Sequence, residues 1–137
     1  MQTLALVLRL SAPVFFVVGA LHLTLGLGAD VLLGAKLSAE VIADPVLDSQ
    51  NRFFGVIFML YGVLFLLCAS DIPKYATVLR CLLWVFFAAG LARLVSVAVH
   101  GVPSLQVVGL LISELVLPPV LVWWLGNVLK SSRDNTY

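Results

Sequence analysis

The stretch FFGVIFMLYGVLFLLCA, residues 53–69, decides the fold because its seventeen consecutive residues carry no charge. A helix needs roughly 20 apolar residues to cross the hydrocarbon core of a membrane. The stretch is slightly short, but Asp44 and Pro45 precede it as a helix start signal, with Asp at the N-cap and Pro at the first helical position. We therefore predict a membrane-spanning helix from Pro45 to about Ala69.

Three further apolar segments of similar length flank this one, at about Leu4–Leu27, Val78–Val99 and Leu105–Leu129. Of the 137 residues, 62% are hydrophobic and only 11% are charged, whereas soluble proteins carry about 25% charged residues. The sequence thus predicts an all-α integral membrane protein, an antiparallel four-helix transmembrane bundle. We expect a single membrane domain over residues 1–129, followed by a loose polar tail over residues 130–137.

The distribution of Lys and Arg between the connecting segments predicts the orientation, because positive charges favour the cytoplasmic side. We expect the first segment to remain as a span rather than be cleaved as a signal peptide, since its apolar stretch is long and no basic region precedes it. One side then holds Arg9, Lys74, Arg80, Lys130 and Arg133, and the other holds only Lys36 and Arg52. The predicted orientation is N-in and C-in, with residues 130–137 in the cytoplasm.

Two ionisable residues of opposite sign lie inside the third and fourth spans. Arg93 is seven residues before His100, near which the third span is predicted to end, and Glu114 is nine residues after Leu105, where the fourth begins. At 1.5 Å per residue these positions are about 10 Å and 13 Å below the outer surface. A lone charge in a membrane is costly, so we predict that Arg93 and Glu114 pair. The pair could bind a ligand, or it could only fix the register of the two helices.

Other polar residues are expected at the same level of the bundle. Asp48 and Arg52 are four residues apart on one helical face, in the favourable acid-first order. Pro118 and Pro119 lack backbone N–H groups, so the carbonyls of Glu114 and Leu115 lose their helical donors close to the buried acid. We predict a ligand-binding site formed by seven residues: His22, Asp48, Asn51, Arg52, Arg93, Ser96 and Glu114.

Several classes of function are disfavoured by what the sequence lacks. A net charge of +1 without a basic run argues against nucleic acid as a partner. Cys68 and Cys81 are too far apart for a CxxC site and too few for a zinc site, so we expect no metal. None of the sequence motifs of hydrolases, nucleotide-binding proteins or zinc proteases is present. We therefore predict no cofactor and no catalytic residue, and we favour a protein that is not an enzyme.

Three segments together resemble a family of small bacterial membrane proteins, domain-of-unknown-function family 4345, related to the DoxX/DoxD-like group. They are DSQNRFFGVIFMLYG (48–62), GLARLVSVAVHGVPS (90–104) and SELVLPP (113–119). The resemblance extends from about Gly19 to Leu125. Its residues are Asn51, Arg52, Gly55, Gly62, Arg93, Ser96, Gly101, Pro103 and Glu114. The resemblance implies a four-helix bundle in the bacterial inner membrane and implies no established activity. The DoxD-like relatives are associated with quinone oxidoreductase complexes, which favours a redox-accessory role.

These observations lead to two functional hypotheses. The first is a small inner-membrane protein that binds an amphiphilic, lipid-like or quinone-like molecule in an outward-facing polar pocket of the bundle. The second is an accessory or assembly subunit of a larger membrane complex, with another membrane protein or further copies of the chain as partner. An enzyme that uses Glu114 or His22 for acid–base chemistry on a lipid or quinone ranks third.

Overall fold

The computed structural model describes residues 1–134, with side chains described for residues 1–132. Over this range the chain is helical and contains no strand. The helices are α1 (Gln2–Leu25), α2 (Gly28–Leu32), α3 (Ala39–Ile42), α4 (Pro45–Ser70), α5 (Ile72–His100) and α6 (Leu105–Asp134). Four of them, α1, α4, α5 and α6, are long and apolar enough to cross a membrane. The all-helical class and the four predicted spans are thus confirmed.

Two of the long helices begin at an Asp that caps the backbone. The Asp44 carboxylate accepts hydrogen bonds from the N–H groups of Val46 (2.8 Å) and Leu47 (3.0 Å), so α4 begins at Pro45 as predicted. Asp71 accepts one from the N–H of Lys74 at 3.1 Å, and α5 begins at Ile72. Helix α5 therefore begins before the apolar run predicted from about Val78, because the Asp71 cap and the following Pro73 start the helix earlier.

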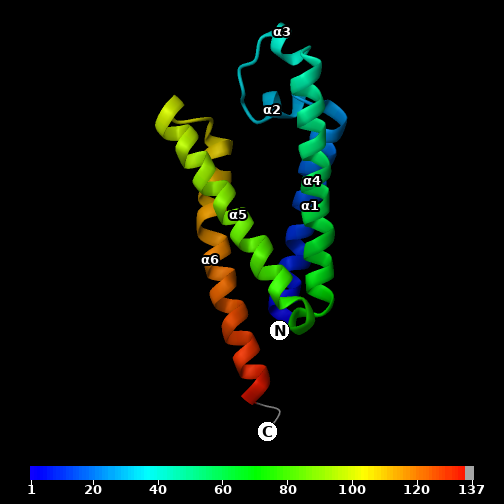
Figure 1. Cartoon of the computed structure of the whole chain (residues 1–137), viewed down its shortest axis with the longest axis vertical. Helices are drawn as coiled ribbons and strands as arrows, with labels where there is room; N and C mark the ends of the chain where they lie inside the picture. Colours follow the sequence, from blue (N-terminus) through cyan, green and yellow to red (C-terminus); the bar gives the residue numbers. More distant parts are fainter. Residues whose placement is uncertain (135–137) are drawn as a thin grey trace. The chain divides into compact units, whose positions relative to one another are not determined.

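The chain divides into two compact units, and residues 6–67 form one of them. In this unit α1 and α4 run side by side in an antiparallel hairpin, and α2 and α3 lie in the connection between them (Figure 1). The two helices are in close contact at Gly19 and Gly55. A Cβ added to Gly55 would lie 2.7 Å from the carbonyl oxygen of Gly19 and 2.7 Å from the backbone nitrogen of Leu23. Glycine is therefore required at this crossing, as is common where membrane helices pack closely.

Aromatic packing continues the contact between α1 and α4 further along the hairpin. The Phe15 ring stacks on Tyr61 with ring centroids 5.7 Å apart and meets Phe65 edge-on at 5.1 Å. A Cβ at Gly62 would lie 3.0 Å from the Phe16 ring, so this glycine makes room for an aromatic side chain of α1. The α1–α4 contact is thus made by glycines towards the end that α2 and α3 connect, and by aromatic rings further from that end.

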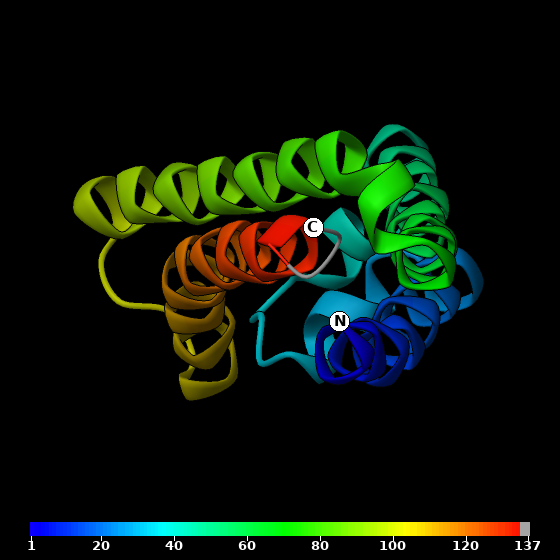
Figure 2. The ribbon, with the colours of Figure 1, turned by 90° about the horizontal axis from the view of Figure 1, so that it is seen from below.

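The second unit contains Met1–Ala5 and the chain from Cys68 onward, and its main feature is the hairpin of α5 and α6. The two helices lie side by side in both views of the ribbon (Figure 1, Figure 2). They are joined by residues 101–104, where Gly101 has φ of 89° and ends α5 in a conformation that favours glycine. Further along the hairpin, a Cβ added to Gly90 of α5 would lie 2.9 Å from the Leu115 side chain and 3.0 Å from the Cβ of Glu114. Helices α5 and α6 are therefore closely packed at Gly90.

The end of the chain differs from its prediction. Residues 130–134, expected to be loose, continue α6 as far as Asp134. Residues 135–137 of the predicted tail lie outside the described residues. The helix continues because its own backbone hydrogen bonds do not depend on apolar side chains, and none of residues 130–134 is Gly or Pro.

Large apolar side chains point away from the protein along these helices. Leu10 is 67% exposed, Phe53 62%, Val95 64% and Trp123 69%. A soluble protein rarely leaves so many large apolar side chains exposed to water. Such surface suits helices whose outer faces contact lipid, which agrees with their length and composition.

Candidate functional site

The seven predicted site residues fall into two groups, one in each hairpin. The first group lies at the end of the hairpin where α2 and α3 connect α1 to α4. It contains His22 of α1 and Asp48, Asn51 and Arg52 of α4. We call them, together with Asp30 of α2, the connection cluster. The second group is the ion pair of Arg93 on α5 with Glu114 on α6. Ser96 is on α5, three residues after Arg93, and is exposed.

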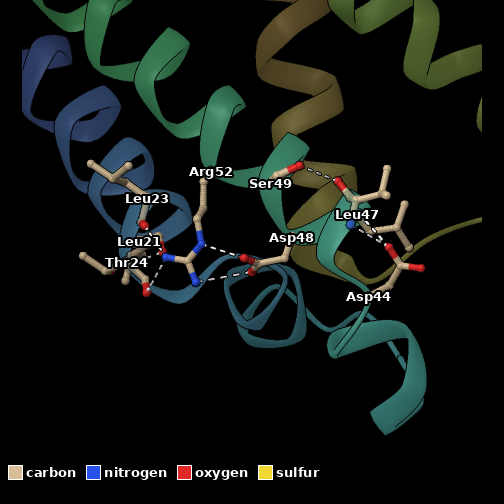
Figure 3. Close-up of polar contacts among 9 residues, drawn as sticks. Leu21, Leu23, Thr24, Asp44, Leu47, Asp48, Ser49 and Arg52 are labelled. Carbon is tan, nitrogen blue, oxygen red and sulfur yellow. Dashed lines mark hydrogen bonds and ion pairs between the residues drawn. The ribbon is translucent and has the colours of Figure 1, made fainter.

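Arg52 is the centre of the connection cluster and uses every nitrogen of its guanidinium (Figure 3). Nε donates to Oδ2 of Asp48 at 2.7 Å and Nη2 donates to Oδ1 of the same carboxylate at 3.3 Å, which confirms the predicted i,i+4 pair. Nη1 donates to the backbone carbonyls of Leu23 (2.7 Å) and Thr24 (3.2 Å). Arg52 therefore joins the start of α4 to the end of α1.

The Arg52 contacts follow from how α1 ends. The last carbonyls of a helix have no helical donors, and a cation close to them is favourable. Helix α1 ends at Leu25, and Gly26 follows with φ of 55°, a left-handed conformation typical of the residue after a helix. A side chain at Gly26 would collide with the Asp48 carboxylate. The glycine thus lets the Asp48–Arg52 pair reach the end of α1.

Asn51 and His22 complete the connection cluster through Asp30. The Nδ2 group of Asn51 donates to Oδ2 of Asp30. His22 is buried, its ring stacks on Phe58, and its Nδ1 lies 2.8 Å from the Val18 carbonyl. Because a carbonyl only accepts, Nδ1 is the donor there, and Nε2 faces Oδ1 of Asp30 at 3.8 Å. Among the described side chains, Oδ1 of Asn51 is a buried oxygen without a hydrogen-bond partner.

Asp30 is a member of this cluster that the sequence reasoning did not select. It lies on α2, a helix of five residues, and contacts Asn51 from twenty-one positions away in the chain. A helix this short has no apolar period to reveal it. The one available signal was an acidic residue close after an apolar span, with a His in the last turn of that span.

The ion pair of the second hairpin is confirmed as predicted. Nε of Arg93 donates to Oε2 of Glu114 at 2.7 Å. The side chain of Glu114 is only 5% exposed, whereas that of Arg93 is 36% exposed. Both residues lie within candidate membrane spans, Arg93 in α5 and Glu114 in α6. The buried carboxylate thus accepts a hydrogen bond from Nε of the guanidinium.

The surroundings of Glu114 are apolar and close-packed. Gly90 lies against its Cβ, and Pro118, one turn further along α6, is fully buried. The ring nitrogen of Pro118 cannot donate to the Glu114 carbonyl, and that of Pro119 cannot donate to the Leu115 carbonyl. Two backbone acceptors without helical donors therefore lie within a turn of the buried acid.

The groups of the two hairpins differ in which of their donors the protein itself uses. Within residues 1–132, no three His, Cys, Asp or Glu side chains gather where they could hold a metal ion. Arg52 has its donors committed to protein acceptors. In the described part of the chain, the hydrogen bond and ion pair of Arg93 both run through Nε to Glu114, so its Nη1 and Nη2 groups can donate to a ligand.

Comparison with known proteins identifies the chain at the level of a family. No curated protein and no solved structure matches this chain. A family model described as a domain of unknown function, DUF4345, matches residues 3–125. This range includes both hairpins, the connection cluster and the Arg93–Glu114 pair. The match covers most of the chain and confirms the resemblance found in its sequence, and the protein therefore belongs to the DUF4345 family.

Proposed function

We propose that the protein binds the polar head of an amphiphilic small molecule, lipid-like or quinone-like, at Arg93 and Glu114. The observation that carries the proposal is the unequal use of the Arg93 guanidinium. Its Nε is held by a buried carboxylate, and its side chain is still 36% exposed within an apolar span. An ionisable residue at such a position usually serves function, and donors left available there favour a ligand with an acceptor oxygen.

The contrast with Arg52 supports the choice of Arg93. Both arginines are partly exposed and both pair with a carboxylate. Arg52 directs its remaining donors to the carbonyls of Leu23 and Thr24, so it holds α1 and α4 together. The carbonyls released by Pro118 and Pro119 add acceptors close to Glu114 that a ligand hydroxyl or a water could use.

We also propose where in the cell the protein lies and from which side its ligand enters. We propose a multi-pass protein of the bacterial inner membrane, oriented N-in and C-in, in which the ligand enters from the outer side. Ser96, three residues after Arg93 on α5, is proposed to contribute to the same site. The ligand partner would be a membrane lipid or a quinone-like molecule, in keeping with the proposed relation to DoxX/DoxD-like proteins.

Native mass spectrometry of the protein extracted under mild conditions tests the proposal. The wild type is compared with Arg93→Leu and with a matched control, Arg80→Leu, which removes an exposed arginine from the first turns of the same helix. We expect a small molecule to remain bound to the wild type and to Arg80→Leu. The folded Arg93→Leu protein should retain about tenfold less of it, since a hydrogen bond from a charged donor is lost.

Two results would contradict the proposal. One is an equal amount of the same molecule on Arg93→Leu, which would separate binding from the guanidinium. The other is a wild type that carries only a protein partner in fixed ratio, which would favour the alternative of an accessory subunit. Circular dichroism of each variant shows whether the helices remain folded.

A further inference from the structure

We infer that the head group bound at Arg93 is uncharged and presents a carbonyl oxygen, so that the site selects against anionic head groups. This inference rests on the proposed binding function and adds the chemical class of the ligand. Quinones and ester-linked neutral lipids share this chemistry. The inference follows from the charges of the α5–α6 hairpin and from the donors of Arg93 that remain available for a ligand.

The Arg93–Glu114 pair is already neutral as a unit. The positive guanidinium and the negative carboxylate are joined by a hydrogen bond of 2.7 Å, and the carboxylate is almost completely buried. A further anion bound to the Nη groups would give the site a net charge of −1. In surroundings of low dielectric constant an uncompensated charge is strongly disfavoured, whereas an uncharged acceptor adds none.

No neighbouring side chain of the hairpin supplies a second positive charge. The positions three and four residues from Arg93 on α5 are Ala89, Gly90, Ser96 and Val97. The corresponding positions around Glu114 on α6 are Leu110, Leu111, Leu117 and Pro118. These are the residues within about one turn of the pair on the same helical faces, and all of them are uncharged.

The cations of the two helices lie far along the chain from the pair. Arg80 is thirteen residues before Arg93, and Lys130 is sixteen residues after Glu114. These separations correspond to about 20 Å and 24 Å along a helix. Both exceed by far the separation of about 4 Å that an ion pair requires, so neither cation forms an ion pair with an anion bound at Arg93.

The donors that remain suit a carbonyl oxygen. Nη1 and Nη2 lie on the guanidinium in a fixed planar fork, and a carbonyl oxygen has two lone pairs. One oxygen can therefore accept from both nitrogens while Nε stays on Glu114. A hydroxyl on the same ligand could donate to the carbonyls that Pro118 and Pro119 release, which lie on the same helix within a turn of Glu114.

The test measures binding of three probes to the purified protein in detergent by native mass spectrometry. The probes are a short-chain ubiquinone analogue, dioctanoylglycerol as a neutral ester lipid, and a short-chain phosphatidylglycerol as an anionic one. For the wild type we expect at least one neutral probe to bind about tenfold more tightly than phosphatidylglycerol. Which neutral probe binds distinguishes a quinone from an ester lipid as the source of the carbonyl.

Glu114→Gln provides the sharper arm, because it removes one charge while the side-chain oxygen can still accept from Nε of Arg93. The site then carries a net charge of +1, and we expect its preference to reverse toward phosphatidylglycerol by about tenfold. Arg80→Leu, which leaves the pair intact, should keep the wild-type preference. If Glu114→Gln does not fold, the relative affinity of the wild type for the neutral and anionic probes is by itself the test of the inference.

The outcomes separate this inference from the binding proposal. Tighter binding of phosphatidylglycerol to the wild type, abolished in Arg93→Leu, would overturn the inference and leave the binding proposal standing. Equal binding of every probe to the wild type and to folded Arg93→Leu would overturn both. Failure of both neutral probes to bind the wild type would also overturn the inference.

Discussion

Arg52 and Arg93 show how two residues of the same type acquire different roles. Each donates a hydrogen bond from Nε to one carboxylate at 2.7 Å. Arg52 lies about two turns into α4, beside the last carbonyls of α1, so its other donors are used by the backbone. Arg93 lies within an apolar span, seven residues before the end of α5, and its Nε donates to the Glu114 side chain of the neighbouring helix. The available donors of Arg93 follow from its position along the helix.

Replacement of Arg52 by Leu should loosen the end of α1. The carbonyls of Leu23 and Thr24 lose their donor, and the Asp48 carboxylate loses its partner. We expect faster amide hydrogen exchange in the last turn of α1 and the first turn of α4, with little change in α5 and α6. Hydrogen–deuterium exchange with mass spectrometry measures this, with Arg80→Leu as the control. Equal protection in wild type and variant would show that Arg52 does not hold the two helix ends together.

Glu114→Leu should destabilise the protein, because Arg93 is left without its partner in apolar surroundings. The expected loss in free energy of unfolding is about 3 kcal/mol, at the lower end for a broken buried pair, since Arg93 is partly exposed. The double variant Arg93→Leu with Glu114→Leu should recover most of this loss, because neither charge remains. Unfolding by SDS in mixed micelles, followed by circular dichroism, measures both values. A double variant as unstable as the sum of the two single ones would contradict the coupling.

At the scale of elements, short polar signals determine where helices begin and glycines determine where they touch. Asp44 and Asp71 each cap a helix that ends in an apolar run. Such caps are local in sequence, so the start of α4 was predictable, and the start of α5 could have been read from Asp71 and Pro73 in the same way. The contact of Gly19 with Gly55 joins residues from two helices, and the sequence alone does not show which glycines meet.

Gly55→Ala should separate α1 from α4. Its new Cβ would lie 2.7 Å from the Gly19 carbonyl oxygen and from the Leu23 backbone nitrogen, neither of which is a flexible side-chain end. We expect a loss of about 1–3 kcal/mol in free energy of unfolding, as for overpacked interiors. Gly109→Ala on α6 is the matched control, because no described atom lies within 4 Å of its added Cβ. The same micelle unfolding assay compares them, and equal stability of the two variants would contradict the close contact.

At the scale of the whole molecule, the chain consists of two helical hairpins connected through the turn at Asp71. Each hairpin has its own close helix contact and its own charged group. If all four long helices cross the membrane, the two termini lie on one side and the connection within each hairpin lies on the other. The count of Lys and Arg predicts that the termini are cytoplasmic.

Cysteine labelling in intact cells tests this orientation. In a variant with Cys68 and Cys81 replaced by Ala, single cysteines are introduced as Lys36→Cys, between α2 and α3, or Lys74→Cys, at the start of α5. A maleimide that does not cross membranes should label Lys36→Cys directly and Lys74→Cys only after the cells are permeabilised. The reverse pattern would mean the opposite orientation, with the proposed ligand entering from the cytoplasm.

The sequence by itself determined the four helical spans, because a bilayer requires long apolar runs and every such run was visible in the composition of a local segment. It also determined the pairs Asp48–Arg52 and Arg93–Glu114, since helical spacing and matched depth left each charge one plausible partner. Only the tertiary structure decided that Asp30 joins Asn51 and that Arg52 is committed to the end of α1. It alone showed that Arg93 retains available donors. These features depend on contacts between residues about twenty to thirty positions apart, where no local period or motif specifies which side chains meet.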